Sequence, residues 1–130
     1  MNSDRKGILG ERAALRYFRA NGYNILATNH KTYVGELDVV AVKSRKLHFI
    51  EVKARQQGGM FAPAEAVDRG KRENIKGSAA AYMNQNRLKM KYQFDIFEVY
   101  LDGDTVVSTN LIEDAFWCFL FRLKSIPPIQ

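Results

Sequence analysis

Two β-rich segments separated by four polar residues constrain the fold of this chain more than any other feature. Residues 37–42 and 47–54 are rich in Val, Ile, Leu and Phe, and the polar stretch 43–46 stands between them. Strong strand formers on both sides of a short polar turn predict a β-hairpin. The fold must therefore contain an antiparallel pair of strands near its centre.

The turn residues set the register of this hairpin. If the turn is centred on residues 44 and 45, the numbers of directly opposed residues sum to 89. Asp38 then faces Glu51, and Glu36 faces Lys53. Because side chains alternate along a strand, these four charged residues share one face of the sheet. The same face carries four apolar residues, Val40, Val42, Leu47 and Phe49.

The rest of the chain alternates helical and extended patterns. The 130 residues contain no repeat and no linker, so we expect one domain over residues 1–130, with 125–130 a short tail. Ile8, Glu11, Leu15 and Phe18 recur at helical spacing, which puts a carboxylate on the face that packs. The order of elements predicts an α/β fold around a mixed sheet. Helices are expected over 8–20, 64–86 and 112–124, further strands over 23–30, 92–101 and 105–108, and a loop over 56–63.

The distribution of charged and apolar residues limits which cellular compartment and which kind of binding partner we expect. Residues 1–91 hold 18 basic and 8 acidic side chains, whereas residues 92–130 hold 2 and 6. A basic body favours a polyanion such as nucleic acid, although a solvated basic surface accounts for the charge equally well. The chain has one cysteine, Cys118, no secretory signal and no apolar run long enough to span a bilayer. We expect a soluble cytoplasmic protein without a membrane partner.

The charged face of the hairpin carries the chemistry. Two carboxylates roughly 5 Å apart on a partly apolar face repel each other unless a proton, a lysine or a metal ion intervenes. Clustered oxygens suit Mg²⁺ or Mn²⁺, and Lys53 could contact a phosphate or help deprotonate water. Glu11 could join the cluster from the first helix. An ordinary salt bridge between Asp38 and Lys53 explains the same residues without chemistry.

These residues resemble a known family. The chain is similar to the YraN-like proteins, which are assigned to the restriction endonuclease-like superfamily with its PD-(D/E)XK signature and are similar to archaeal Holliday-junction resolvases. Gln93 departs from the pattern, because that family often has arginine there. The resemblance covers about residues 7–114 and rests on Gly10-Glu11, Gly22-Tyr23, Asn29, Gly35-Glu36-Leu37-Asp38, Phe49-Ile50-Glu51-Val52-Lys53-Ala54-Arg55, Lys71 and Phe94-Asp95.

The resemblance implies a three-layer restriction endonuclease-like fold and a nuclease site. Asp38 and Glu51 match the acidic metal ligands, Lys53 the catalytic lysine, and Glu11 the glutamate borne on the first helix. We predict metal binding by Asp38, Glu51, Glu11 and Val52, with Glu36 in a secondary role. The nucleic-acid contacts are expected from Arg55, Lys71, Arg12, Arg16 and Lys76, with Arg19 and Arg72 beside them.

Two hypotheses about function follow. The first is a Mg²⁺-dependent endonuclease-like protein that cleaves DNA, with branched DNA as a substrate and a homodimer as the form that suits it. The second is a non-catalytic module of the same fold that binds nucleic acid or a protein; a third, weaker one is hydrolysis of another phosphate ester. His30 and His48 are expected to be structural, because His48 points away from the carboxylate face.

Overall fold

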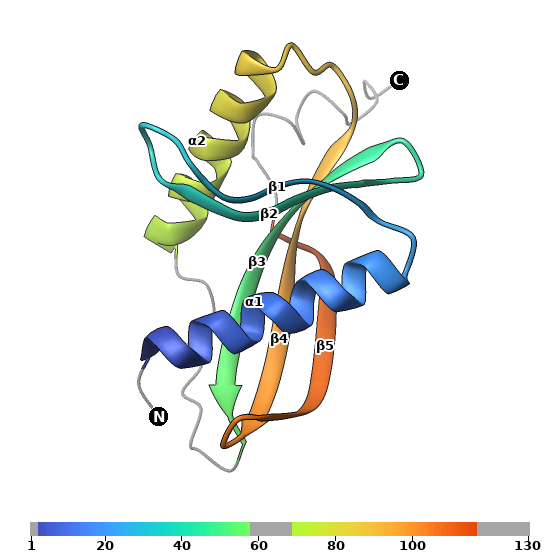
Figure 1. The fold of residues 1–130 in the computed structure, drawn as a ribbon. Helices are drawn as coiled ribbons and strands as arrows, with labels where there is room; N and C mark the ends of the chain where they lie inside the picture. The colour runs from blue at the N-terminus through green and yellow to red at the C-terminus, as the bar shows by residue number, and fades with distance from the viewer. Residues whose placement is uncertain (1–2, 58–68, 117–130) are drawn as a thin grey trace, which may run out of the picture.

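The computed structural model describes residues 3–57 and 69–116. Within these described ranges, two helices and five strands follow one another (Figure 1). Their order confirms the expected alternation of helices and strands. The elements are α1 (Ser3–Ala20), β1 (Asn24–Lys31), β2 (Glu36–Lys43), β3 (Lys46–Gln56), α2 (Arg69–Gln85), β4 (Tyr92–Asp102) and β5 (Thr105–Phe116).

The five strands form one mixed sheet in the order β1-β2-β3-β4-β5. Strands β3 and β4 are parallel, and the other neighbouring pairs are antiparallel. Parallel neighbours need a crossover, and α2 lies in the segment between β3 and β4. The predicted mixed sheet is therefore confirmed.

Each helix covers one face of this sheet and completes a three-layer α/β fold. Phe18 of α1 packs with Ile50 and Phe97 in one buried cluster. Tyr82 of α2 packs with Phe49 in the other. Because residues 49 and 50 are neighbours on β3 and point to opposite faces, the two clusters lie on opposite sides of the sheet. Within the described residues, no helix is both long and apolar enough to cross a membrane.

The central hairpin has the expected register. Residues pair from Lys43↔Lys46 at the turn to Val39↔Ile50, and each pair sums to 89. Ser44 and Arg45 both have positive φ, at 53° and 63°. Two such residues form the tight turn that matches the twist of a hairpin.

The first helix differs from its expected bounds and buried face. It begins at Ser3 instead of residue 8. Ile8 is exposed, whereas Ala14 and Phe18 are fully buried. The stripe that packs on the sheet continues through Gly10, where an added Cβ would lie 2.8 Å from Cβ of Ala54. A glycine thus lets the helix approach β3 closely.

The last strand is longer than the expected residues 105–108. Strand β5 runs for 12 residues to Phe116, so the helix expected from residue 112 is wrong over residues 112–116. The apolar side chains there pack within the sheet instead. Ile112 pairs with Ile96, and the Phe116 ring stacks on the Phe94 ring with their centroids 5.0 Å apart. The expected helix beyond residue 116, the tail 125–130, Cys118, and residues 58–68, which include most of the expected loop and the start expected for the second helix, lie outside the described residues.

Candidate functional site

The candidate site lies where β2 leaves its partner β3. The regular pairing of the hairpin ends at Val39↔Ile50. One residue further, the backbone amide of Val52 donates a hydrogen bond to Oδ2 of Asp38 at 2.9 Å. The side chain of Asp38 thus bonds a backbone amide of β3 directly beyond the last regular pair. This contact fixes Asp38 beside Glu51.

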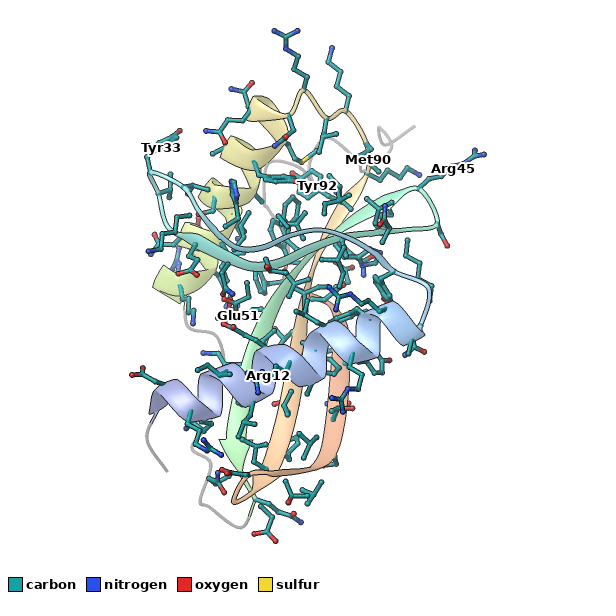
Figure 2. The ribbon with its side chains drawn as sticks, viewed as in Figure 1. Arg12, Tyr33, Arg45, Glu51, Met90 and Tyr92 are labelled. Atoms are coloured by element: carbon teal, nitrogen blue, oxygen red, sulfur yellow. The ribbon has the colours of Figure 1, made fainter. Side chains whose placement is uncertain are left out.

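Glu51 is the second acidic group, and it is almost completely buried, with 4 % of its surface exposed. Figure 2 shows Glu51 between α1 and the beginning of α2. Burial and the negative charge of Glu51 raise the pKa of Asp38 to about 7, against the opposing hydrogen bond from Val52. The sheet therefore holds two carboxylates whose simultaneous ionisation is unfavourable without a cation.

Lys71 supplies part of the countercharge. Its Nζ lies 2.5 Å from Oε1 of Glu51. Burial acts to lower the pKa of Lys71, but its hydrogen bond to Glu51 and the charge of Glu51 prevail and raise it. The sequence suggested Lys71 as a phosphate contact, and its pairing with Glu51 across the sheet–helix boundary was not foreseen. No short-range pattern links two residues that far apart in the chain.

Lys53 joins the cluster from β3. Burial, followed by the positive charge of Lys71, lowers the pKa of Lys53. Lys53 and Lys71 interact directly, and both interact with Glu51. The structure thus brings together two acids and two lysines, from β2, β3 and the first turn of α2.

Glu11 approaches from the opposite helix, and its described hydrogen bond goes elsewhere. Asn29 of β1 donates from Nδ2 to Oε2 of Glu11 at 3.2 Å. Asn29 lies between two paired positions of β1 and so stands opposite Asp38. In the described part of the chain, Asn29 links Glu11 to the strand that carries Asp38, and no hydrogen bond joins the two carboxylates.

Glu36 does not occupy the expected place. It is exposed and pairs with Lys31 of β1. Its predicted pairing with Lys53 is wrong, because the pairs between β2 and β3 end at Val39↔Ile50. The side chains of β2 do not alternate strictly between the two faces of the sheet. Leu37 and Val40 are three residues apart, which should put them on opposite faces, yet both pack in the cluster under α2. A strand that departs from its partner no longer obeys the register of the hairpin.

The predicted nucleic-acid contacts lie on α1, on α2 and on β3. Arg12 and Arg16 are exposed on α1. Lys71 and Lys76 lie on α2, across the sheet, and Lys76 pairs with Glu73 at 3.1 Å. Of the expected residues, Arg55 is mostly buried, and its guanidinium lies 3.8 Å from Glu98.

A loop that sequence analysis missed lies beside the site. The hydroxyl of Thr32 accepts hydrogen bonds from the amides of Val34 and Gly35, and lies 2.8 Å from the hydroxyl of Ser78 on α2. These contacts anchor the loop between β1 and β2 to the helix. The ring of Tyr33 nevertheless remains 89 % exposed. The structure therefore presents an aromatic side chain on a well-anchored loop that leads into β2.

The donor set of Asp38 and Glu51 fits a hard divalent cation. Two adjacent carboxylates offer the oxygen ligands that Mg²⁺ and Mn²⁺ accept. Burial, followed by the negative charge of Glu51, raises the pKa of Asp38, and a bound cation would oppose both effects. Val52 borders the same site through its amide.

Comparison with known proteins places the chain in a family. Residues 10–99 match the uncharacterised protein family UPF0102. The chain belongs to this family. A UPF0102 protein of Porphyromonas gingivalis is 41% identical over 124 residues, which cover 95% of this chain and 92% of that protein. A UPF0102 protein of Acetivibrio thermocellus is 39% identical over 121 residues, with 88% and 93% covered. The match includes all the acidic and basic residues of the candidate site.

Proposed function

We propose that this UPF0102 protein is a metal-dependent phosphodiester hydrolase of the endonuclease type that acts on nucleic acid, with DNA as the substrate. The observation that supports this most directly is the cluster of Asp38, Glu51, Lys53 and Lys71 where β2 leaves β3. The resemblance to restriction endonuclease-like proteins and to Holliday-junction resolvases favours the same chemistry on branched DNA.

Each residue of the cluster has a role in the proposed reaction. Asp38 and Glu51 would hold Mg²⁺, with Val52 at the edge of the site and Glu11 oriented by Asn29. A bound Mg²⁺ would polarise the scissile phosphate and favour the hydroxide form of a bound water. Lys53 would contact the phosphate or orient the attacking water. Lys71 would turn from Glu51 toward the phosphate once a dication balances the carboxylates.

The basic helices would bind the nucleic-acid backbone. Arg12 and Arg16 on α1 and Lys71 on α2 would contact the backbone from opposite faces of the sheet. Such contacts recognise phosphates with little sequence information, so affinity should fall steeply with salt.

The deciding experiment is cleavage of labelled single-stranded, duplex, flapped and four-way-junction DNA by the purified protein. Each substrate is incubated with Mg²⁺, with Mn²⁺ or with EDTA. We expect metal-dependent cleavage that Glu51→Gln, Asp38→Asn and Lys53→Ala abolish, while DNA binding persists. Glu73→Gln is the matched control, because Glu73 is an exposed glutamate on α2 that pairs with Lys76.

Two results would contradict the proposal. One is cleavage that survives in both Glu51→Gln and Asp38→Asn, which would trace the activity to a contaminating nuclease. The other is the lack of cleavage of any DNA, and of RNA counterparts, by protein that binds them.

A binding module is the second candidate, and one contact favours it. The ammonium of Lys71 already lies against Glu51, in the position where a cation would balance the carboxylates. In a module, this pair would be permanent and the metal dispensable. Binding of DNA that is equal with Mg²⁺ and with EDTA, in the absence of cleavage, would support this candidate.

A further inference from the structure

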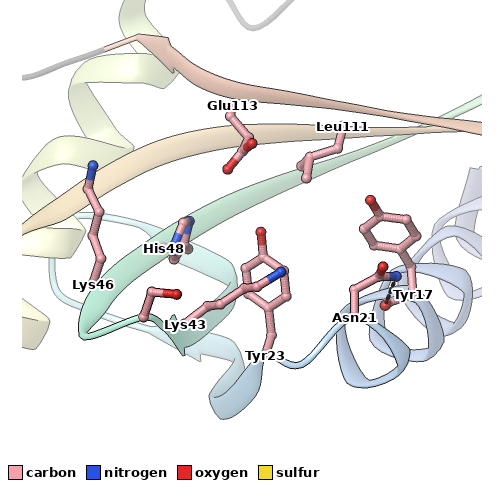
Figure 3. Close-up of a pocket in the computed structure, with 9 residues that line it drawn as sticks. Tyr17, Asn21, Tyr23, Lys43, Lys46, His48, Leu111 and Glu113 are labelled. Carbon is pink, nitrogen blue, oxygen red and sulfur yellow. Dashed lines mark hydrogen bonds between the residues drawn. The ribbon is translucent and has the colours of Figure 1, made fainter.

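A second cluster of polar groups lies on the other face of β3. A pocket of about 340 Å³ opens beyond the end of α1, between the β2–β3 turn and β5. Figure 3 shows its lining, in which the hydroxyl of Tyr23 and the carboxylate of Glu113 point toward one another. This pocket contains none of the residues of the candidate nuclease site.

His48 is the buried polar side chain of this pocket. Only 6% of its side chain is exposed, and its Nδ1 lies 2.7 Å from Oδ2 of Asp95, which is fully buried. Because a carboxylate only accepts hydrogen bonds, Nδ1 donates its proton to Asp95 in the metal-free protein, and an ion bound at this nitrogen would replace that proton. The ring lines the pocket.

Asp95 holds the imidazole in a fixed orientation. Its Oδ1 accepts hydrogen bonds from the amide of Asp114 at 2.9 Å and from Nε2 of Gln93 at 2.7 Å. Gln93 also donates to Glu113 at 3.4 Å, so the same amide orients both carboxylates.

The third group completes a set of metal ligands. His48, Asp95 and Glu113 offer ligand atoms that all lie within 4.8 Å of one another. The pocket also holds Lys43, but its ammonium lies 4.8 Å above the Tyr23 ring and forms no ion pair with either carboxylate among the described residues. Two carboxylates and an imidazole favour a divalent transition metal such as Zn²⁺ over Mg²⁺, which prefers oxygen ligands alone.

We propose that His48, Asp95 and Glu113 bind one divalent transition-metal ion, with Zn²⁺ as the best-matched ion, at a site separate from the Asp38–Glu51 cluster. This revises the expectation that His48 is merely structural. The proposal does not depend on nuclease activity. The pocket leaves room beside the ion for water or a small ligand.

The test is a titration of the metal-free, full-length protein with Zn²⁺ in the presence of excess Mg²⁺, followed by calorimetry. Excess Mg²⁺ competes for the Asp38–Glu51 site and leaves the imidazole site to Zn²⁺. We expect one equivalent to bind with at least micromolar affinity, and the histidine NMR signals of His48 to shift on binding. A parallel Co²⁺ titration should show the visible absorption of a nitrogen-ligated ion.

Two variants locate the ion. His48→Asn retains a donor toward Asp95 but lacks the imidazole, and it should weaken binding by about 100-fold. Glu113→Gln changes an exposed residue, so it should fold normally while binding about 10-fold more weakly. Glu51→Gln is the matched control and should bind Zn²⁺ as the unmodified protein does.

The opposite pattern overturns the proposal. Zn²⁺ binding that Glu51→Gln abolishes and Glu113→Gln leaves intact would assign the ion to the first cluster. Binding weaker than micromolar in the unmodified protein, or binding unaffected by both variants of this pocket, would equally reject the site. Thermal unfolding without metal, measured for every variant, separates loss of binding from loss of fold.

Discussion

Strand β3 carries an acidic cluster on each of its faces, and the two clusters satisfy their charges differently. On one face, fully buried Asp95 has partners for both oxygens, His48 on Oδ2 and two nitrogen donors on Oδ1. On the other face, Asp38 has one backbone donor and a buried carboxylate as its neighbour. Burial alone therefore does not decide what a carboxylate does. In the metal-free chain, hydrogen bonds balance the charge of Asp95, whereas Asp38 is left with charge that a bound cation would balance.

The largest expected effect comes from removing these two groups. Asp95→Ala leaves the donors of His48, Gln93 and Asp114 without their acceptor, and it should lower the free energy of unfolding by about 3–5 kcal/mol. Asp38→Asn keeps an oxygen for the amide of Val52 and removes the repulsion from Glu51. It should raise the stability of the metal-free protein by about 1 kcal/mol at pH 8.

Urea denaturation of the metal-free protein measures both changes. Leu26→Ala, a change at an exposed position of β1, serves as a control for the effect of mutation itself. Equal destabilisation by Asp95→Ala and Asp38→Asn would contradict the proposal that only the charge of Asp95 is balanced by hydrogen bonds in the metal-free protein.

The pH dependence of stability sharpens the same comparison. The pKa of Asp38 is raised to about 7 in the folded chain, above its ordinary value of 3.8. The folded state thus holds a proton that the unfolded state has released, so the contribution of Asp38 is fully present below pH 4 and is lost as pH rises to 7. We expect the metal-free protein to lose about 4 kcal/mol between pH 4 and pH 8 through this group, because each pKa unit corresponds to about 1.4 kcal/mol.

The measurement compares urea midpoints of the unmodified protein and Asp38→Asn across that range, in EDTA. The difference between the two curves isolates Asp38 from other titrating groups. A difference that stays constant with pH would contradict the raised pKa. Added Mg²⁺ should restore stability at pH 8 in the unmodified protein more than in the variant, because a cation favours the ionised carboxylate.

A smaller effect is expected where α1 contacts β3 next to the first cluster. A methyl group at Gly10 would lie 2.8 Å from Cβ of Ala54 and 3.5 Å from Val52. Gly10→Ala should therefore push α1 away from the strand and cost about 1–2 kcal/mol. Gly7→Ala is the matched control on the same helix, because nothing lies within 4 Å of its added methyl group.

The two glycine variants should shift stability in opposite directions. Gly7→Ala removes backbone freedom from the unfolded chain and should stabilise by about 0.5 kcal/mol. Thermal unfolding of the two variants side by side measures the contrast. A Gly10→Ala protein as stable as Gly7→Ala would show that the approach of α1 to Val52 is not tight.

The features that the sequence predicted correctly depend on residues close together in the chain. Alternation and the turn at Ser44 and Arg45 gave the hairpin register, and with it the closeness of Asp38 and Glu51. The pattern failed at Glu36, because β2 leaves β3 after Val39, and strand separation has no signature in alternation. It failed again at residues 112–116, where apolar residues that suit a helix are used by long-range pairing with β4.

Contacts between distant segments could not be predicted at all. Lys71 meets Glu51 only because α2 packs over β3, and His48 meets Asp95 only because β3 and β4 are parallel neighbours. A single sequence specifies such pairs through the whole fold and through no short motif. The basic residues of α1 and α2 illustrate the same limit, because composition gives their number and only the fold divides them between two faces.

The smallest expected effect on stability, at Tyr33, tests whether the first cluster faces nucleic acid. Its ring is 89 % exposed on a loop anchored by the hydroxyls of Thr32 and Ser78. Tyr33→Ala should leave the unfolding temperature nearly unchanged, since the ring makes little contact with the protein. If the proposed function is correct, the ring can stack on an unpaired base, and its loss should weaken binding of single-stranded or branched DNA by about 10-fold. Fluorescence anisotropy in EDTA measures this binding without cleavage, and Tyr33→Phe, which keeps the ring, should bind like the unmodified protein. Equal affinity of the Ala and Phe variants would show that the loop does not contact the bases, while Glu51→Gln in the cleavage assay would still decide whether the cluster is catalytic.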